Sequence, residues 1–160
     1  MKTQKITLII SFILLSACSI TDKVQDTTYK ENISRGTSSD IVANTEKILH
    51  RYSYSIERTD VTSNRIRYET DWKLRLPSTS ELEAKFEQVK TKIIVTARPR
   101  MRTEYGESRL YNVQFQGYTE YLAEGEEAWQ KHTIDKEAED YLKNIAYELR
   151  TELERVLHSN

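Results

Sequence analysis

The sequence of 160 residues contains little cysteine, glycine or proline: one Cys, four Gly and two Pro. A single Cys excludes an internal disulfide and any cysteine-based metal cluster. Four Gly are too few for a glycine-rich phosphate loop, and neither G-x-x-x-x-G-K-[ST] nor G-x-G-x-x-G occurs. With 24 Lys+Arg against 25 Asp+Glu, the charges nearly cancel. Length and charge together predict one globular domain rather than a nucleic-acid-binding arm.

The first 17 residues have the pattern of an export signal. Lys2 and Lys5 precede an apolar run over residues 6–15, which is shorter than the roughly 20 residues that a membrane-spanning helix needs. The run ends in Leu15, Ser16, Ala17 and Cys18. These four residues resemble the lipobox of bacterial lipoproteins, in which the Cys receives diacylglycerol before cleavage on its N-terminal side. The alternative is an ordinary secretory signal with an incidental Cys.

The lipobox resemblance implies that Cys18 becomes the lipidated first residue of the mature protein. Ser19 follows it, where Asp would imply retention in the inner membrane of enteric bacteria. We therefore expect a lipid anchor in the outer membrane, with the domain on the periplasmic face. Residues 18–39 are polar and lack a hydrophobic period, which predicts a flexible tether. Residues 40–160 are expected to form the globular domain.

Two segments have the apolar spacing of amphipathic helices. The first is 39–52, with Ser39 as its expected N-cap. The second is 135–157. Their apolar stripes consist of Ile41, Thr45, Ile48, Leu49 and Tyr52 in the first, and of Ala138, Tyr141, Leu142, Ile145, Leu149, Leu153 and Val156 in the second.

Four segments predict strands. Residues 52–58 alternate with period two, and 60–64 supply turn residues. Residues 65–76 alternate without exception, which predicts one half-buried strand. Residues 88–102 and 109–122 predict two more, joined by a turn at Tyr105, Gly106 and Glu107. The core face of the strand at 65–76 is expected to hold Ile66, Tyr68, Thr70, Trp72, Leu74 and Leu76.

The segment 80–87 fits two interpretations. Ser80 and Glu83 have the spacing of a helix capping box, and Leu82 and Phe86 fit either a helical stripe or a strand. The resulting order, α-β-β-β-β-α, predicts an α+β two-layer sandwich. In it, a four-stranded antiparallel sheet carries the N-terminal and C-terminal helices on one face, and its other face is open.

The first helix, the strand at 52–56 and the strand at 66–72 resemble a helix-grip unit of envelope lipoproteins. An example is the C component of the outer-membrane β-barrel assembly machine, where the second strand of the hairpin carries a segment like Thr70-x-Trp72. The similarity covers 41–76, under a quarter of the chain. This chain has one such unit instead of two, and a shorter tether. The resemblance implies the fold and transfers no functional residues.

No arrangement of residues predicts catalysis, a metal or a cofactor. His50, His132 and His158 lie far apart and show neither H-x-x-x-H nor H-E-x-x-H spacing. Glu69 and Asp71 share a strand face, as paired glycosidase carboxylates can. Because Arg67 and Lys73 flank them on that face, a solvated ladder of cross-strand ion pairs is the favoured interpretation. We expect a protein that is not an enzyme.

Basic residues are concentrated in the predicted strands. Between Gln88 and Arg102 there are five basic residues and no acidic one. If the strands pair, arginines of neighbouring strands share the open face and could bind lipid phosphates or an acidic partner. The alternative is an edge strand protected from aggregation by its charges. Together with Trp129, an aromatic residue in a charged loop, the candidate contacts are Arg65, Arg67, Arg98, Arg100 and Arg102, with Arg75 on the same predicted face.

These observations predict a non-catalytic outer-membrane lipoprotein that acts as a periplasmic binding or scaffolding module in envelope assembly or maintenance. Its expected partners are the membrane, through the lipid on Cys18, and an envelope protein; the export signal excludes nucleic acid. One alternative is a lipid- or lipopolysaccharide-binding accessory that uses the basic sheet face. Another is an envelope hydrolase. The sequence leaves the oligomeric state open.

Overall fold

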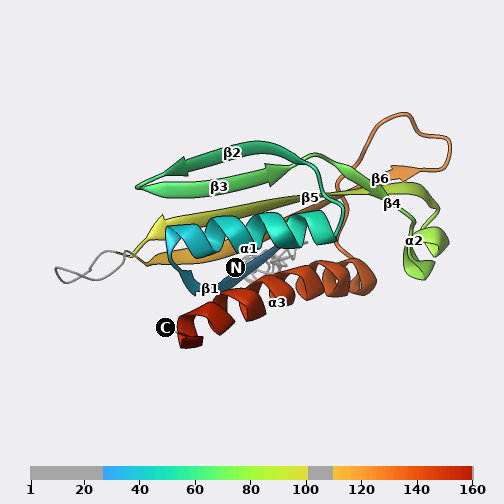
Figure 1. The fold of residues 1–160 in the computed structure, drawn as a ribbon. Coiled ribbons are helices and arrows are strands. Elements are labelled where there is room, and N and C mark those ends of the chain that lie inside the picture. Colours follow the sequence, from blue (N-terminus) through green and yellow to red (C-terminus); the bar gives the residue numbers. More distant parts are fainter. Residues whose placement is uncertain (1–26, 101–109, 160) are drawn as a thin grey trace, which may run out of the picture.

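The computed structural model describes residues 27–100 and 110–159. They form an α+β domain built on one antiparallel sheet of six strands (Figure 1). Its elements in chain order are β1 (Thr28–Gly36), α1 (Ser38–Arg51), β2 (Ile56–Thr62), β3 (Arg65–Thr70), β4 (Lys73–Arg75), α2 (Thr79–Glu83), β5 (Phe86–Pro99), β6 (Tyr111–Ala123) and α3 (Lys136–Ser159).

The sheet order is β1-β6-β5-β3-β2, and β4 also pairs with β5. The strands from β2 to β6 follow one another as the expected antiparallel meander. The predicted count of four strands is wrong for two reasons. A strand precedes α1, and the strand predicted at 65–76 is divided into β3 and β4.

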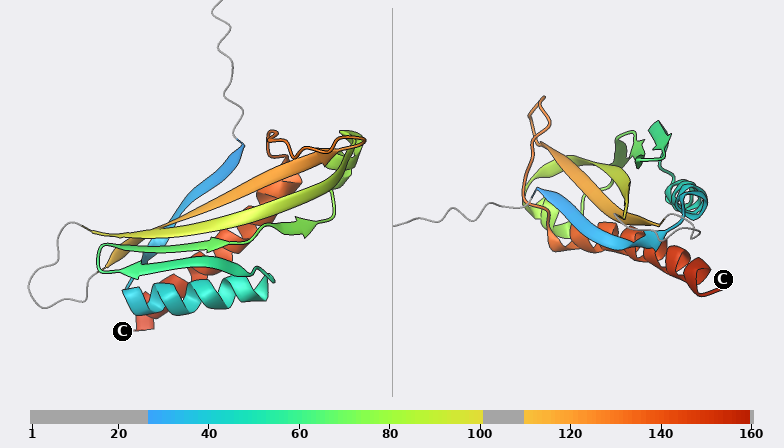
Figure 2. Two further views of the ribbon diagram at one scale, coloured as in Figure 1. Left: turned by 90° about the horizontal axis from the view of Figure 1, so that it is seen from above. Right: turned by 90° about the vertical axis from the view of Figure 1, so that its left-hand side faces the viewer.

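Both long helices lie on the same face of the sheet (Figure 1), and the view from above shows the sheet and the helices as two layers (Figure 2). The main core fills the space between these layers. It joins the buried stripes of α1 and α3 to the inward-facing residues of the strands. The predicted helical stripes are confirmed, with Ile41, Thr45, Ile48, Leu142, Ile145 and Leu153 each no more than 1% exposed.

The tether predicted for residues 18–39 is wrong for its second half, because residues 28–36 form β1. This strand pairs along its length with β6, which supplies its backbone hydrogen bonds. The alternation of apolar and polar residues along β1 is hidden in the sequence, because charged Glu31 lies between Tyr29 and Ile33 on the inward face. There, Arg150 of α3 forms an ion pair with Glu31. The strand leads directly into α1, whose N-cap is Thr37 instead of the expected Ser39.

One extra residue separates β3 from β4. Between Glu69 and Lys73 the chain advances four residues, while the partner strand β5 advances only three, from Ile94 to Thr91. Because side chains alternate along a strand, this insertion reverses the face of every residue that follows. The expected core positions after the insertion are therefore wrong, and the exposed fractions are 37% for Trp72, 61% for Leu74 and 89% for Leu76.

The same reversal turns Lys73 and Arg75 toward the helix side of the sheet. Lys73 donates a 2.5 Å hydrogen bond to the Tyr52 carbonyl oxygen. Arg75 enters a buried ion pair with Glu81 of α2. The ambiguous segment 80–87 contains both expected structures, the end of a short helix and the start of β5. Its capping box is formed by Ser78 and Glu81, two residues before the predicted pair.

Candidate functional site

The open face of the sheet carries a network of ion pairs rather than a uniformly basic surface. Arg65 pairs with Asp60 across the β2–β3 hairpin. Glu69 lies 2.9 Å from Arg67 and 2.8 Å from Lys92 on β5. The hydrogen bonds from Lys92 and Arg67 lower the pKa of Glu69. Of the expected ladder of cross-strand ion pairs, Glu69 forms one, with Lys92 on β5, whereas its pair with Arg67 lies within β3. Arg65 and Arg67 are thus both neutralised.

Two of the remaining candidate arginines lie at the opposite end of this face from β4. Arg98 and Arg100 are exposed, and neither forms an ion pair with a residue that the structure describes. Exposed Arg35 of β1 lies nearby, since Arg35 and Arg98 both pair with Asn112. Arg102 falls outside the described residues. Arg75 does not share the open face, because it is buried on the other side.

Trp129 lies far from these arginines along the sheet and belongs to a second group. The Lys90 ammonium nitrogen is 4.2 Å from the Trp129 ring centre and 4.8 Å from the Trp72 ring centre. It also lies 3.0 Å from Glu120 on β6. Leu74 pairs directly opposite Lys90 in the β4–β5 ladder. We call Trp72, Leu74, Lys90 and Trp129 the tryptophan surface.

The described chain begins beside the tryptophan surface. Thr27 and Thr28 line a small hollow together with Trp72 and Tyr118. The tryptophan surface is therefore close to the point at which the chain connects to residues 1–26. The extra residue between β3 and β4 turns Trp72 and Leu74 to the open face, and in this way it creates the surface.

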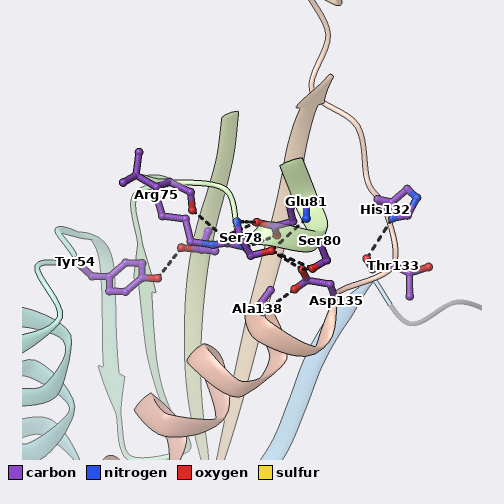
Figure 3. Close-up of polar contacts among 11 residues, drawn as sticks. Tyr54, Arg75, Ser78, Ser80, Glu81, His132, Thr133, Asp135 and Ala138 are labelled. Carbon is purple, nitrogen blue, oxygen red and sulfur yellow. Dashed lines mark hydrogen bonds and ion pairs between the residues drawn. The ribbon is translucent and has the colours of Figure 1, made fainter. Parts of the chain in front are cut away.

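A second site lies at the junction of β4, α2 and the start of α3 (Figure 3). Arg75 donates hydrogen bonds of 2.7 and 2.5 Å to the two carboxylate oxygens of Glu81. Glu81 is 2% exposed and also accepts the backbone N–H of Ser78 at 2.7 Å. Both charges of this pair are thus compensated where water has little access.

Asp135 connects α2 to α3 in the same cluster. Its carboxylate accepts hydrogen bonds from the Ser78 hydroxyl at 2.7 Å, the Ser80 hydroxyl at 2.5 Å and the Ala138 backbone N–H at 2.6 Å. Burial raises the pKa of Asp135, but these hydrogen bonds outweigh it, so that the pKa lies below the ordinary value of 3.8. Asp135 therefore caps α3 as a carboxylate.

Beside this cluster is a cavity of about 230 Å³, which we call the α2 pocket. Phe86, Tyr121 and His132 form its aromatic wall. The Phe86 ring centre lies 4.7 Å from that of Tyr121 and 5.3 Å from that of His132. Ser80, Glu81 and Asp135 contribute its polar side, and the remaining lining residues are Ala84, Thr133 and Ile134.

Three buried polar atoms around the α2 pocket have no hydrogen-bond partner in the described structure. They are the Tyr121 hydroxyl, the Thr133 hydroxyl and Nε of Arg75. The Asp135 backbone N–H lies near the Tyr121 hydroxyl, but no hydrogen bond of ordinary geometry joins them. Unpaired buried polar groups are uncommon and destabilising. Because three of them lie around one cavity, this cavity is a candidate binding site.

Three further questions raised by the sequence concern the lipidation site, a metal site and a membrane-spanning helix. Cys18 lies outside the described residues. Among the side chains that the structure describes, those of residues 27–100 and 110–156, no group of three His, Cys, Asp or Glu is placed to hold a metal ion. The same part of the chain has no helix with the length and apolar character needed to cross a membrane.

Sequence reasoning missed the α2 pocket and, of the four residues of the tryptophan surface, identified only Trp129 as a candidate contact. The pocket combines residues from α2, β5, β6 and the segment before α3. No spacing in the sequence indicates that these segments meet. The one available signal was the Ser-x-x-Glu pattern of Ser78 and Glu81, which marks a helix start. Trp72 was assigned to the core because its alternation with Ile66 and Tyr68 is perfect in the sequence.

Comparisons with known proteins add no assignment of family or function. No family model matches the chain, and no curated protein matches it in sequence. Among solved structures, the chain matches the uncharacterized conserved protein YugN from Geobacillus kaustophilus HTA426. The match has 9% sequence identity and a TM-score of 0.38, and covers 81% of this chain and 90% of that one. At this similarity it contributes nothing to the assignment of a site, so the function rests on the residues themselves.

Proposed function

We propose that this protein is a lipid-anchored outer-membrane lipoprotein that acts as a non-catalytic binding or scaffolding module in the bacterial envelope. Its contact site for an envelope protein partner is the tryptophan surface. The observation that carries the proposal is the grouping of exposed Trp72, exposed Leu74 and half-buried Trp129 around Lys90, on a sheet face that neither long helix covers. Tryptophan is enriched among the residues that dominate binding energy at protein interfaces.

The proposed anchor places this surface close to the membrane. Eight residues separate Cys18 from Thr27, so the lipidated residue lies within about 30 Å of the described domain. Thr27 lines the same hollow as Trp72. A partner that binds the tryptophan surface would therefore sit at the membrane surface, which is where a tethered envelope module would meet it.

Site-specific photo-cross-linking in intact cells tests the contact site. A photoreactive amino acid replaces Leu74, which is 61% exposed, or Tyr147 on α3, which is equally exposed. We expect a defined cross-linked protein only from position 74, and its loss with Trp129→Ala. The same products from both positions would contradict the proposed surface.

The anchor itself is tested separately. We expect the mature protein to carry lipid on Cys18, as shown by its mass. Cys18→Ala should release the domain from the membrane fraction. An unmodified Cys18 would overturn the lipoprotein assignment while leaving the contact site open to the cross-linking test.

A second candidate function, binding of anionic lipid or lipopolysaccharide, is favoured by the exposed arginines at the other end of the open face. Arg98 and Arg100 lack acidic partners among the described residues. Binding to phosphatidylglycerol vesicles should weaken with salt and with Arg98→Glu plus Arg100→Glu. The matched control is Arg65→Glu, because Arg65 is already paired with Asp60. If the affinity for vesicles changes neither with salt nor with the charge-reversal variant, this function is excluded.

A further inference from the structure

We propose that the α2 pocket binds a small uncharged aromatic compound that carries a carbonyl or carboxamide oxygen. The aromatic ring would pack on the wall formed by Phe86, Tyr121 and His132, and the oxygen would accept a hydrogen bond from the Tyr121 hydroxyl. This site is independent of the lipid anchor and of the tryptophan surface.

The size of the α2 pocket, which is partly open to solvent, suits a ligand with one substituted ring. A dry apolar cavity of about 150 Å³ accommodates benzene, and the α2 pocket is larger, at about 230 Å³. The added volume suits a short substituent. Larger ligands would need more space, since drug-sized compounds occupy pockets of roughly 300 Å³ and above.

The aromatic wall determines how the ring is held. The Phe86 and His132 rings meet edge to face, with an interplanar angle of 67°. The Phe86 and Tyr121 rings are tilted by 34° at 4.7 Å. A further ring can add to such a group in offset-stacked or edge-to-face geometry, which stabilises aromatic pairs beyond simple burial.

The charges around the pocket argue for a neutral ligand. The Glu81 carboxylate is occupied by Arg75 and the Ser78 N–H, and the Asp135 carboxylate by three donors. Neither carboxylate therefore needs a positively charged ligand to compensate its charge. A cationic or anionic compound would instead lose its hydration without gaining a free counter-ion.

The orphaned hydroxyls define the polar end of the ligand. Tyr121 is 1% exposed, and burial together with the nearby Glu81 and Asp135 carboxylates raises the pKa of its hydroxyl. The hydroxyl therefore keeps its proton and is a donor without an acceptor. A carbonyl oxygen supplies that acceptor. Thr133 also lines the pocket, and its buried hydroxyl, which also lacks a partner, would be a second donor for the same oxygen.

The experiment titrates the detergent-solubilised full-length protein with three probes and follows backbone amide chemical shifts in NMR spectra. Benzamide has the ring and the acceptor, toluene lacks the acceptor, and benzoate carries a charge. For a ligand of this size we expect benzamide to bind in the low millimolar range, with shifts centred on His132 and Thr133. Toluene and benzoate should bind at least about fivefold more weakly.

Three variants distinguish specific binding in the α2 pocket from non-specific contact. Tyr121→Phe keeps the aromatic wall and should weaken benzamide binding about tenfold while leaving toluene binding unchanged. Ala84→Phe fills the pocket and should abolish binding of all probes. Tyr54→Phe, which changes an equally buried tyrosine outside the pocket, should leave benzamide binding unchanged.

Two results would overturn the proposal. One is the absence of benzamide-induced shifts up to about 10 mM, which would mean that water alone satisfies the orphaned groups. The other is equal benzamide affinity in the wild type and in Tyr121→Phe. Neither result depends on lipidation of Cys18 or on cross-linking at the tryptophan surface.

Discussion

The side chain of Leu142 on α3 occupies the space that a β-carbon on residue 117 would need. A β-carbon built on Gly117 would lie 2.7 Å from both δ-carbons of Leu142, which is fully buried. Gly117 is in the interior of β6, paired with Tyr29 on β1 and with Ile93 on β5. Its missing side chain therefore lets α3 approach the sheet, and this close packing positions the helix that carries Asp135 at its start.

Replacing this glycine should force α3 away from the sheet. We expect Gly117→Ala to lower the free energy of unfolding by about 2 kcal/mol, because over-packed cores relax only partly. Urea denaturation measures the change. Leu142→Ala should cost about 3 kcal/mol alone, and the double variant clearly less than the sum of both, because the clash is gone. Strictly additive effects would mean that Leu142 is not the residue displaced.

The buried ion pair between Arg75 and Glu81 should be sensitive to loss of one partner. Glu81→Gln leaves the Arg75 guanidinium without its counter-ion in a buried setting, at an expected cost of about 3 kcal/mol. Asp60→Asn, at the more exposed Arg65–Asp60 pair, is the control and should cost less than about 1 kcal/mol. Both are read from chemical denaturation. Similar costs for the two variants would argue against burial as the cause.

Two equally buried tyrosines should respond in opposite directions to loss of the hydroxyl. The Tyr54 hydroxyl shares a 2.6 Å hydrogen bond with Thr91, whereas the Tyr121 hydroxyl has no partner in the described structure. We expect Tyr54→Phe to destabilise the fold by about 1 kcal/mol and Tyr121→Phe to stabilise it by a similar amount. Thermal denaturation without ligand measures both. Destabilisation by Tyr121→Phe would mean that the hydroxyl is paired after all.

Asp135 should give the protein a stability component that depends on pH. Its pKa in the folded state lies below the ordinary value of 3.8. The contribution is therefore complete above about pH 4 and disappears as the pH falls through the lower, folded-state pKa. Asp135→Asn should cost about 1 kcal/mol at pH 7, and its difference from the wild type should shrink below about pH 4.

Denaturation curves between pH 7 and pH 2 check this dependence. Ser80→Ala removes one of the three donors to Asp135 and should produce a smaller change in the same pH range. If the gap between the wild type and Asp135→Asn stays constant down to pH 2, the carboxylate does not act through its ionisation.

The regular elements with one apolar face could be predicted from the sequence. Ile41, Ile48 and Leu49 recur at helical spacing and are buried together, as are Leu142, Ile145 and Leu149. These patterns are local, since a helix buries residues that are close in the sequence. The α+β class and the central meander follow from the same local patterns.

The sequence did not show β1, because a strand of mostly polar residues is stable only where a neighbour completes its hydrogen bonds. Its inward-facing Glu31 is acceptable because Arg150, far along the chain, pairs with it. The division of the strand at 65–76 was equally hidden. It depends on where the partner strand β5 places its residues, and Thr70 marks the break by accepting the Ile93 backbone N–H.

The two long helices and the alternating strands were thus determined by the sequence alone, because each is a pattern within one continuous segment; the lipobox, which lies outside the described residues, stays a prediction. Only the tertiary structure decided which charges are free, that Trp72 is exposed rather than in the core, and where the cavity lies. Arg67 is neutralised by Glu69 on its own strand, while Arg75 reaches its partner only after the insertion turns it inward. Ser78 and Asp135 meet because α2 packs against the start of α3. Such contacts join residues distant in the chain, and no local period encodes them.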